Sequence, residues 1–274
     1  MIINGSEIAK KIRTEIKQKV EKLDEKPGLA VVLAGDDPAS EIYVKYKEKA
    51  CEEIGIYSEK HVLKKEITMN EVLDIIERLN NDEKIHGILV QLPLYDHLDE
   101  YRIIDAIYPK KDVDGFHPIN VGNLLIGKES IIPCTPKGII RLIKSTGEKI
   151  EGKNAVVVGR SNIVGKPVSV LLLRENATVT ICHSRTKNLK EHTKNADILV
   201  CAVGIAKFIK KDMVKKGSII IDVGMNRVEG KLYGDIDFEN IKDKTSWITP
   251  VPKGVGPMTI AMLMQNTLEC YEKT

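Results

Sequence analysis

Residues 152–167 read G-K-N-A-V-V-V-G-R-S-N-I-V-G-K-P, and this stretch decides the fold. Residues 155–158 are a short run of small and β-branched apolar residues, typical of a strand that is buried on both faces. The run ends at Gly159, and Pro167 favours the start of a helix, because its fixed φ suits the first turn. A strand, a glycine-bounded turn and a helix N-terminus present unpaired N–H groups to an anion such as pyrophosphate. The stretch therefore predicts a nucleotide-binding βα unit, although Ser161 replaces the second glycine of G-x-G-x-x-G and a tight turn without ligand is the alternative.

The residues after the second strand of this unit indicate which nucleotide it binds. Residues 182–187 read C-H-S-R-T-K, with no acid to bind a ribose 2′-hydroxyl and with two cations. Together with Arg160 in the first turn, Ser184 and Arg185 suit a 2′-phosphate, so the sequence predicts NADP as the cofactor. The alternative is that these cations belong to an ordinary solvated surface.

The composition describes a soluble globular protein of 274 residues, with 42% hydrophobic and 30% charged residues and a net charge of +3. Lysines and glutamates are interspersed, so nothing indicates a nucleic-acid or membrane surface. Glu7 and Glu15 lie among the N-terminal lysines and argue against a targeting peptide. Five scattered cysteines without C-x-x-C predict reduced thiols in the cytoplasm and no metal site.

Hydrophobic spacing predicts an α/β protein with two domains. Helices are expected at 8–23, 39–54, 71–79, 137–145, 168–173 and 259–271, and strands at 29–33, 87–91, 155–158, 178–181, 198–202 and 218–223, with one more ending near 62–63. This alternation is typical of parallel sheets with helices on both faces. We expect one domain at 1–120 and a second, Rossmann-type domain from residue 121 to residue 256.

Lys47 differs from the lysines around it in the helix predicted at 39–54. At about 100° per residue, Tyr43, Lys47 and Ile54 fall within about 40° of one another, on the apolar side. Lys45 and Lys49 point the other way, among glutamates. A lysine that faces a cleft loses hydration, which favours its neutral form and suits a base or proton shuttle. The alternative is a lysine whose stem follows the edge of the core out to water.

Four other polar residues are candidates for a site. Gln91 ends a strand at the carboxyl end, where open α/β sheets bind ligands, but its amide could equally cap a loop. Asp114 precedes a glycine and could serve the turn alone. His117, between Phe and Pro, is expected to be structural, and His183 lines the edge of the nucleotide unit.

Six motifs together resemble those of the bifunctional methylenetetrahydrofolate dehydrogenase/methenyltetrahydrofolate cyclohydrolase family. They are V-V-G-R-S-N-I-V-G-K-P, Y-V-K-Y-K, G-I-L-V-Q-L-P-L, K-D-V-D-G-F-H-P, P-C-T-P-K-G and P-V-P-K-G-V-G-P-M-T. The resemblance covers essentially the whole chain, with the motifs in the expected order and spacing. The resemblance implies a folate-binding catalytic domain that the terminal helix 257–274 joins, an NADP-binding domain, a cleft between them and a homodimer. It also implies oxidation of 5,10-methylenetetrahydrofolate by NADP and hydrolysis to 10-formyltetrahydrofolate, within one-carbon metabolism and purine biosynthesis.

The resemblance assigns roles to individual residues. Lys47 matches the catalytic lysine, Tyr43 its stacking and orienting partner, and Gln91 the glutamine that tunes the lysine. Asp114 matches the carboxylate that holds the amino-pyrimidine edge of the pterin, and Pro257 a substrate contact. The residues that match cofactor contacts are Gly159, Arg160, Ser161, Ile163, Gly165, Ser184 and Arg185.

One departure and several alternatives remain. Lys253 stands where the family often has glycine, so the shape of its loop is in question if that position needs positive φ. A short-chain dehydrogenase also uses Tyr-x-x-x-Lys, but its nucleotide loop precedes that motif, whereas Gly159 follows Lys47. A non-catalytic NADP sensor leaves Gln91 and Asp114 without a purpose. The closest rival is a monofunctional dehydrogenase without cyclohydrolase activity.

Overall fold

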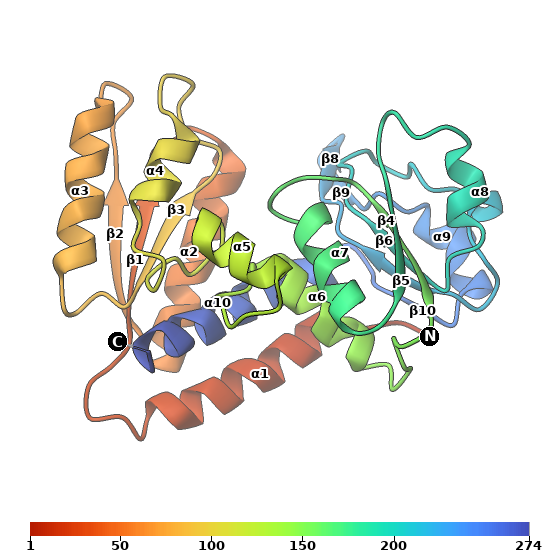
Figure 1. Cartoon of the computed structure of the whole chain (residues 1–274), viewed down its shortest axis with the longest axis horizontal. Coiled ribbons are helices and arrows are strands. Elements are labelled where there is room, and N and C mark those ends of the chain that lie inside the picture. The colour runs from red at the N-terminus through yellow and green to blue at the C-terminus, as the bar shows by residue number, and fades with distance from the viewer. Residues whose placement is uncertain (274) are drawn as a thin grey trace. The chain divides into compact units, whose positions relative to one another are not determined.

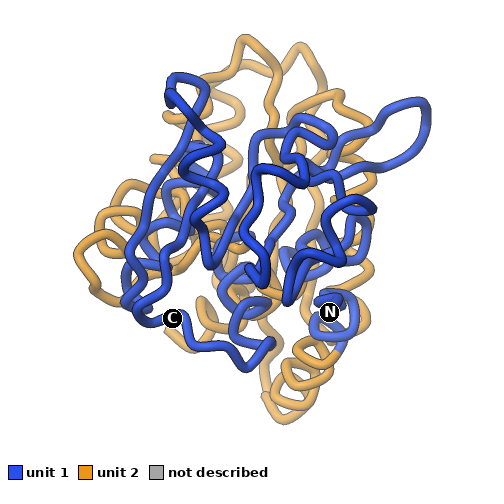
Figure 2. The backbone as a smooth tube through the Cα atoms, turned by 90° about the vertical axis from the view of Figure 1, so that its right-hand side faces the viewer, with its two compact units in different colours: residues 1–10, 135–259 blue, residues 11–134, 260–274 orange. Residues whose placement is uncertain are grey.

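The computed structural model describes residues 1–273, which form two compact units (Figure 2). Unit 1 comprises residues 1–10 and 135–259, and unit 2 comprises residues 11–134 together with the chain from residue 260. The chain therefore leaves unit 2 and returns to it for its last helix. The functional boundaries expected at residues 120 and 256 remain predictions.

Unit 2 is built on a three-stranded parallel sheet in the order β2-β1-β3 (Figure 1). The strands are β1 (Gly28–Leu33), β2 (Tyr57–Val62) and β3 (Gly87–Gln91). Every residue of the central strand β1 is buried, as its run of apolar residues predicts. Leu33 pairs with Gln91, so the carboxyl ends of β1 and β3 lie at one edge of the sheet.

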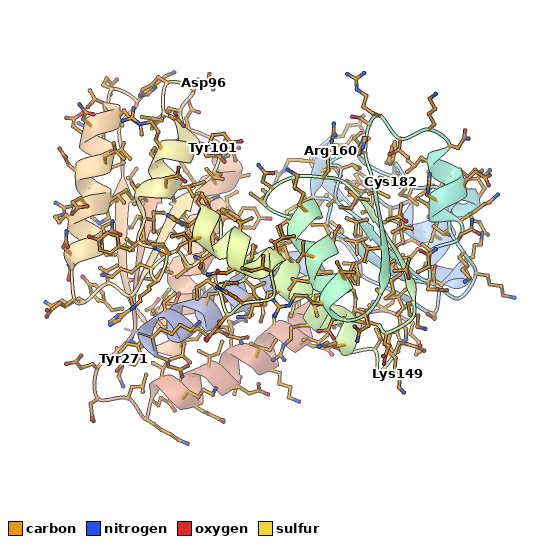
Figure 3. The ribbon with its side chains drawn as sticks, in the orientation of Figure 1. Asp96, Tyr101, Lys149, Arg160, Cys182 and Tyr271 are labelled. Carbon is orange, nitrogen blue, oxygen red and sulfur yellow. The ribbon has the colours of Figure 1, made fainter. Side chains whose placement is uncertain are left out.

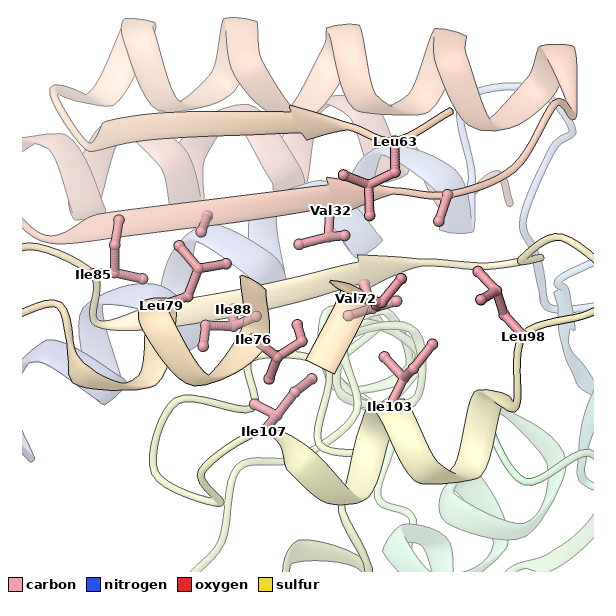
Figure 4. Close-up of a cluster of buried hydrophobic side chains, with 13 residues drawn as sticks. Val32, Leu63, Val72, Ile76, Leu79, Ile85, Ile88, Leu98, Ile103 and Ile107 are labelled. Carbon is pink, nitrogen blue, oxygen red and sulfur yellow. The ribbon is translucent and has the colours of Figure 1, made fainter. Parts of the chain in front are cut away.

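The helices that lie mainly in unit 2 surround this sheet (Figure 1). They are α1 (Gly5–Val20), α2 (Pro38–Ile54), α3 (Met69–Asn81), α4 (Glu100–Ala106), α5 (Pro118–Leu125) and α10 (Val255–Tyr271). Helices α3 and α4 close one face, where Val32, Ile76 and Ile103 meet in a buried apolar cluster (Figure 4). Helix α2 packs on β1 and β2.

Helix α2 has clear start and stop signals. The Asp37 carboxylate accepts hydrogen bonds from the N–H groups of Ala39 and Ser40, and Gly55 ends the helix in the left-handed conformation. Helices α4 and α5 were not expected from the sequence, because seven and eight residues are too few to show a clear apolar period.

The end of α10 is buried in unit 2. The Asn266 side-chain amide donates to the carbonyl oxygens of Val113 (2.8 Å) and Ile132 (2.9 Å). The ring of Tyr271 meets that of His86 edge to face, with centroids 4.8 Å apart. Met262 and Met264 of this helix are both 0% exposed.

Unit 1 is built on a five-stranded parallel sheet in the order β10-β7-β6-β4-β5. The strands are β4 (Asn154–Val158), β5 (Thr178–Cys182), β6 (Ile198–Cys201), β7 (Ile219–Asp222) and β10 (Trp247–Ile248). The sheet therefore confirms the expected Rossmann-type alternation. Strand β4 has β5 on one side and β6 on the other, so the chain order reverses at β4, where such sheets bind nucleotides.

The remaining elements of unit 1 surround this sheet. They are α6 (Cys134–Lys144), α7 (Gly165–Arg174), α8 (Leu189–Thr193), α9 (Phe238–Ile241), the 3₁₀ turns Lys211–Met213 and Lys242–Lys244, and the antiparallel pair β8 (Asn226–Val228) and β9 (Lys231–Tyr233). Helices α6 and α7 lie on one side of the sheet and α8 and α9 on the other (Figure 1).

Candidate active site and nucleotide-binding end

Lys47 projects from α2 towards the end of β3. Its side chain is 8% exposed, while Lys45 and Lys49 are exposed to solvent, as the helical wheel predicts. The Lys47 Nζ donates a hydrogen bond to Gln91 Oε1 at 2.7 Å. The alternative interpretation, in which this lysine extends along the core edge to water, is therefore wrong.

Gln91 is itself held from its other end. Its Nε2 donates to the carbonyl oxygen of Leu92 at 2.7 Å, and the Ser40 hydroxyl donates to the same oxygen at 3.2 Å. The glutamine oxygen is consequently turned to the lysine, and the amide orientation follows from this pair of contacts. This contact is compatible with the tuning role that the resemblance implies for Gln91, and that role remains a prediction.

Lys47 and Asp114 influence each other electrostatically. Burial lowers the pKa of the Lys47 ammonium, although the charges of Asp114 and Cys134 act in the opposite direction. Burial raises the pKa of the Asp114 carboxyl to about 6, and Asp112 adds to this rise, while Lys47 and Cys134 oppose it. Asp114 is partly buried, and the loss of contact with solvent is the largest cause of the rise in its pKa. Both groups are thereby moved towards their neutral forms.

The turn that carries Asp114 is built by its neighbour Asp112. The Asp112 carboxylate is 2% exposed and accepts hydrogen bonds from the N–H groups of Gly115 (3.0 Å) and His117 (2.8 Å) and from Asn120 Nδ2 (2.9 Å). The turn role considered for Asp114 therefore belongs to Asp112, a residue the sequence analysis missed. His117 is structural, as expected, because its Nδ1 accepts the Ile119 N–H at the start of α5.

Tyr43 lies one helical turn before Lys47 and is half-buried. Burial, with a smaller effect of Tyr46, raises the pKa of the Tyr43 phenol, so the hydroxyl is neutral near neutral pH. A neutral phenol ring on the same helix face as the lysine suits the predicted stacking and orienting role.

The nucleotide-binding end of unit 1 begins where β4 stops. Gly159 has φ +130°, and a Cβ there would overlap the carbonyl oxygen of Ala202. A Cβ at Gly165 would overlap the carbonyl oxygen of Gly159. Both positions therefore need glycine for close approach of backbone segments, which is how dinucleotide-binding turns use it.

Ser161 accepts hydrogen bonds from N–H groups that were expected to be unpaired. Its hydroxyl oxygen accepts from the N–H groups of Val164 (3.1 Å) and Gly165 (3.3 Å), and its carbonyl oxygen accepts from Lys166 N–H (3.1 Å). The first turn of α7 is thus capped from within the chain. The expectation of unpaired helix N–H groups is therefore wrong for Val164, Gly165 and Lys166. A phosphate bound here would instead contact mainly the exposed turn 160–163, which includes Arg160.

The predicted 2′-phosphate residues lie on adjacent strand ends. Val158 pairs with Cys182, so Arg160 and residues 183–185 follow neighbouring strands at one edge of the sheet. Figure 3 shows Arg160 and Cys182 near this end and Lys149 at the opposite end. Arg160, Ser184 and Arg185 are exposed, and Ile163 is 40% exposed beside them in sequence. The residues present therefore fit a nucleotide with an extra phosphate.

Lys253 adopts the backbone conformation that the sequence analysis questioned. Its φ is +81°, in the left-handed region, where a non-glycine residue costs about 1 kcal/mol or more. Its carbonyl oxygen accepts the Ser6 N–H at 3.1 Å, which holds the loop in this shape. Pro257 follows in the first turn of α10 and is partly buried.

Among residues 1–273, no cluster of three His, Cys, Asp or Glu side chains is arranged to hold a metal ion. Within the same residues, no helix combines the length and apolar character needed to cross a membrane.

Comparison with known protein families decides what these sites belong to. The family pattern "Tetrahydrofolate dehydrogenase/cyclohydrolase, catalytic domain" matches residues 3–114, and "Tetrahydrofolate dehydrogenase/cyclohydrolase, NAD(P)-binding domain" matches residues 133–274. The chain belongs to this family. The family is that of the sequence resemblance, and the chain is accordingly an enzyme with both domains.

Individual relatives agree over the full length of the chain. The "Bifunctional protein FolD" of Bacillus cytotoxicus is 58% identical, covering 100% of this chain and 97% of the relative. The structure of a bifunctional FolD enzyme from Campylobacter jejuni is 49% identical with a TM-score of 0.98, covering 100% and 99% of the two chains. A Trypanosoma brucei dehydrogenase-cyclohydrolase, solved with NADP and an inhibitor, is 36% identical with a TM-score of 0.96, covering 100% of this chain and 97% of that one.

Proposed function

We propose that this protein oxidises 5,10-methylenetetrahydrofolate to the 5,10-methenyl compound with NADP and hydrolyses that product to 10-formyltetrahydrofolate. The observation that carries the proposal is the 2.7 Å hydrogen bond from Lys47 to Gln91 in unit 2, beside the carboxyl group of Asp114. An isolated nucleotide-binding domain would have no use for this arrangement.

The oxidation depends chiefly on positioning. A hydride leaves a carbon bridge between two nitrogens, so positive charge develops on the folate, and bound NADP supplies the hydride acceptor. Asp114 accepts the two adjacent donors on the pterin edge with its two carboxylate oxygens. Tyr43 supports the ring from the same side as Lys47. Correct placement of the bridge supplies most of the effect for such a step.

The hydrolysis depends on proton movement. Water attacks the cationic methenyl carbon and loses a proton. The bond from this carbon to one ring nitrogen then breaks as that nitrogen gains a proton, and the remaining hydroxyl proton is released when the formyl group forms. Burial makes Lys47 easier to deprotonate than a solvated lysine, and Gln91 fixes the direction of its amine. Lys47 therefore acts as the proton carrier, with Gln91 and Tyr43 as the residues that orient it.

NADP is preferred over NAD because of the residues at the nucleotide-binding end. Arg160, Ser184 and Arg185 supply two cations and a hydroxyl where an NAD site needs an acid. The Trypanosoma brucei relative was solved with NADP, which supports the same assignment. Gly159, Gly165, Ser161 and Ile163 shape the turn that receives the phosphates.

A monofunctional dehydrogenase is the alternative function. It would need the folate positioned but would need no proton carrier at the reacting carbon. The buried Lys47–Gln91 pair favours the bifunctional enzyme, because burial makes the lysine easier to deprotonate and only hydrolysis needs a group that moves protons.

We also propose that the protein acts as a cytoplasmic homodimer in one-carbon metabolism, where 10-formyltetrahydrofolate serves purine biosynthesis. The family resemblance supports the dimer and the metabolic role. The five cysteines are buried free thiols, which supports a reducing compartment.

Two spectrophotometric assays on the purified protein test the function. NADPH formation with methylenetetrahydrofolate measures oxidation, and the decay of methenyl absorbance measures hydrolysis. We expect both activities, with NADP strongly preferred over NAD. Oxidation without hydrolysis would establish the monofunctional alternative, and neither activity would overturn the proposal.

A further inference from the structure

The loop after β6 borders the nucleotide-binding end of unit 1. Strand β6 lies directly beside β4, and Val158 pairs with Cys201. A Cβ at Gly159 would overlap the carbonyl oxygen of Ala202, so the start of this loop touches the first turn of the nucleotide unit. Residues 202–205 therefore lie next to β4, the strand at which the chain order of the sheet reverses and where such sheets bind nucleotides.

Asp235, which follows β9, fixes the backbone of this loop. Its Oδ2 accepts hydrogen bonds from the N–H groups of Val203 (2.7 Å) and Gly204 (3.0 Å). Its Oδ1 accepts from Ile205 N–H (2.9 Å) and Asn226 Nδ2 (2.9 Å). Asp235 is 0% exposed, so these four contacts replace the water that its carboxylate would otherwise bind. Three consecutive N–H groups of the loop point at one side chain.

A second buried carboxylate holds Asp235 in place. Asp222, at the end of β7, is 2% exposed and accepts from the N–H groups of Asp235 (2.8 Å), Ile236 (3.0 Å) and Gly224 (3.1 Å). A Cβ at Gly224 would overlap the Asp235 carboxyl group, and one at Gly234 would overlap that of Asp222. The two carboxylates and the two glycines therefore pack against one another without room for a Cβ, and this packing fixes the position of Asp235.

We propose that Asp235 is a positioning residue of the cofactor site, whose carboxylate holds residues 203–205 in the shape that contacts bound NADP. The inference rests on the proposed function of unit 1 as the NADP-binding part of the enzyme. Asp235 acts through the backbone of the loop and touches neither the folate nor Lys47.

The two activities of the enzyme separate this role from a purely structural one. Hydrolysis of the methenyl compound uses Lys47 and Gln91 in unit 2 and consumes no nucleotide. A general loss of folding would lower both activities together. A misplaced loop would weaken NADP binding and leave hydrolysis intact.

The primary variant is Asp235→Asn, which keeps the shape but presents an NH₂ group to backbone donors. We expect the NADP Kd and the KM for NADP to rise about tenfold or more, because a buried donor loses its acceptor. The KM for the folate and the cyclohydrolase rate should stay within about twofold, since no contact in unit 2 changes.

Asp197→Asn is the matched control. Asp197 also accepts a backbone N–H, that of Asn154 at 2.9 Å, but at the opposite end of the same sheet. This variant should leave NADP affinity unchanged. An equal loss of NADP affinity in both variants would mean a general effect on unit 1 and would overturn the proposal.

A compensating pair tests the contact directly. Asn226→Asp alone places a second carboxylate against Asp235 and should weaken NADP binding. Asp235→Asn combined with Asn226→Asp restores a donor–acceptor pair between the two side chains, with the roles exchanged, and should recover part of the affinity.

If Asp235→Asn does not fold, Asn226→Ala provides a milder test. It removes one of the four hydrogen bonds to Asp235 from a partly buried position and should raise the NADP Kd by a smaller factor.

The outcomes distinguish this inference from the proposed function. If the parent protein binds NADP and performs both reactions, but Asp235→Asn binds NADP as tightly as the parent, the role proposed for Asp235 is wrong and the proposed function stands. Parent protein without NADP binding or oxidation would overturn the proposed function first.

Discussion

Lys47 and Asp114 are a pair of opposite charges that burial drives towards neutrality. Each partner stabilises the charged form of the other, yet burial has the larger effect on both. The lysine can therefore give up a proton more readily than its solvated neighbours. The carboxyl group of Asp114, with its pKa raised to about 6, stays ionised at neutral pH but with a small margin.

Folate binding should weaken as the pH falls through about 6. Asp114 accepts pterin donors only when ionised, and a raised pKa of about 6 places its ionised form above that pH. Affinity should be constant above about pH 7 and fall towards tenfold per pH unit well below 6. Titration calorimetry with a chemically stable folate between pH 5 and 8 measures this change.

Asp114→Asn is the control for this titration. The amide cannot ionise, so the variant should bind folate more weakly at pH 8 and show no dependence on pH between 5 and 8. A parent protein whose folate affinity is flat across this range would show that the Asp114 carboxylate does not bind the pterin.

We propose that the unit formed by β4, the turn at 159–164 and α7 determines which nucleotide binds. Ser161 caps the first turn of α7 from inside the chain, so the helix amides of Val164 and Gly165 are already bonded. For binding a phosphate, the positive charge on the turn is therefore more important than the N–H groups at the start of α7. Arg160 is exposed at the carboxyl end of β4, beside the strand that leads to Ser184 and Arg185.

Removal of the Arg160 side chain should reduce NADP affinity about tenfold or more, with little effect on NAD. A charge-assisted contact to phosphate contributes about 1.5–3 kcal/mol, and NAD lacks that phosphate. Arg160→Ala is compared with Arg174→Ala, an exposed arginine at the far end of α7. Fluorescence titration with both nucleotides measures the change. Equal losses for NADP and NAD would show that Arg160 does not recognise the 2′-phosphate.

At the level of the whole molecule, long elements with regular apolar spacing were predictable, and so were the residues fixed by a helical wheel. Lys47 is an example, because α2 has 17 residues and its apolar positions repeat over several turns, which defines the buried face of the helix. Short elements such as α4, α5 and the β8–β9 pair gave no such signal.

Buried acids were not predictable for a different reason. Asp112 and Asp114 stand two positions apart in one turn, and only the folded backbone shows which of them accepts three hydrogen bonds in that turn. Asp235 was missed because its partners at 203–205 are about thirty positions away in sequence. Contacts of this kind depend on which strand ends lie together, and hydrophobic periodicity carries no information about that.

The central claim is that Lys47 carries a proton in hydrolysis and is less important for hydride transfer. Lys47→Met keeps an unbranched side chain of similar length with good helix propensity, so α2 should persist. Lys47→Arg keeps the charge but cannot release its proton near neutral pH.

Paired assays on one preparation of each variant test this claim most directly. A positioned acid or base typically contributes about 10²–10⁴-fold, so both variants should lose nearly all hydrolysis of the methenyl compound. Lys47→Met should keep a measurable part of its NADPH formation, because alignment with the nicotinamide does not need the amine. A folded Lys47→Met protein that hydrolyses the methenyl compound at the parent rate would contradict the account.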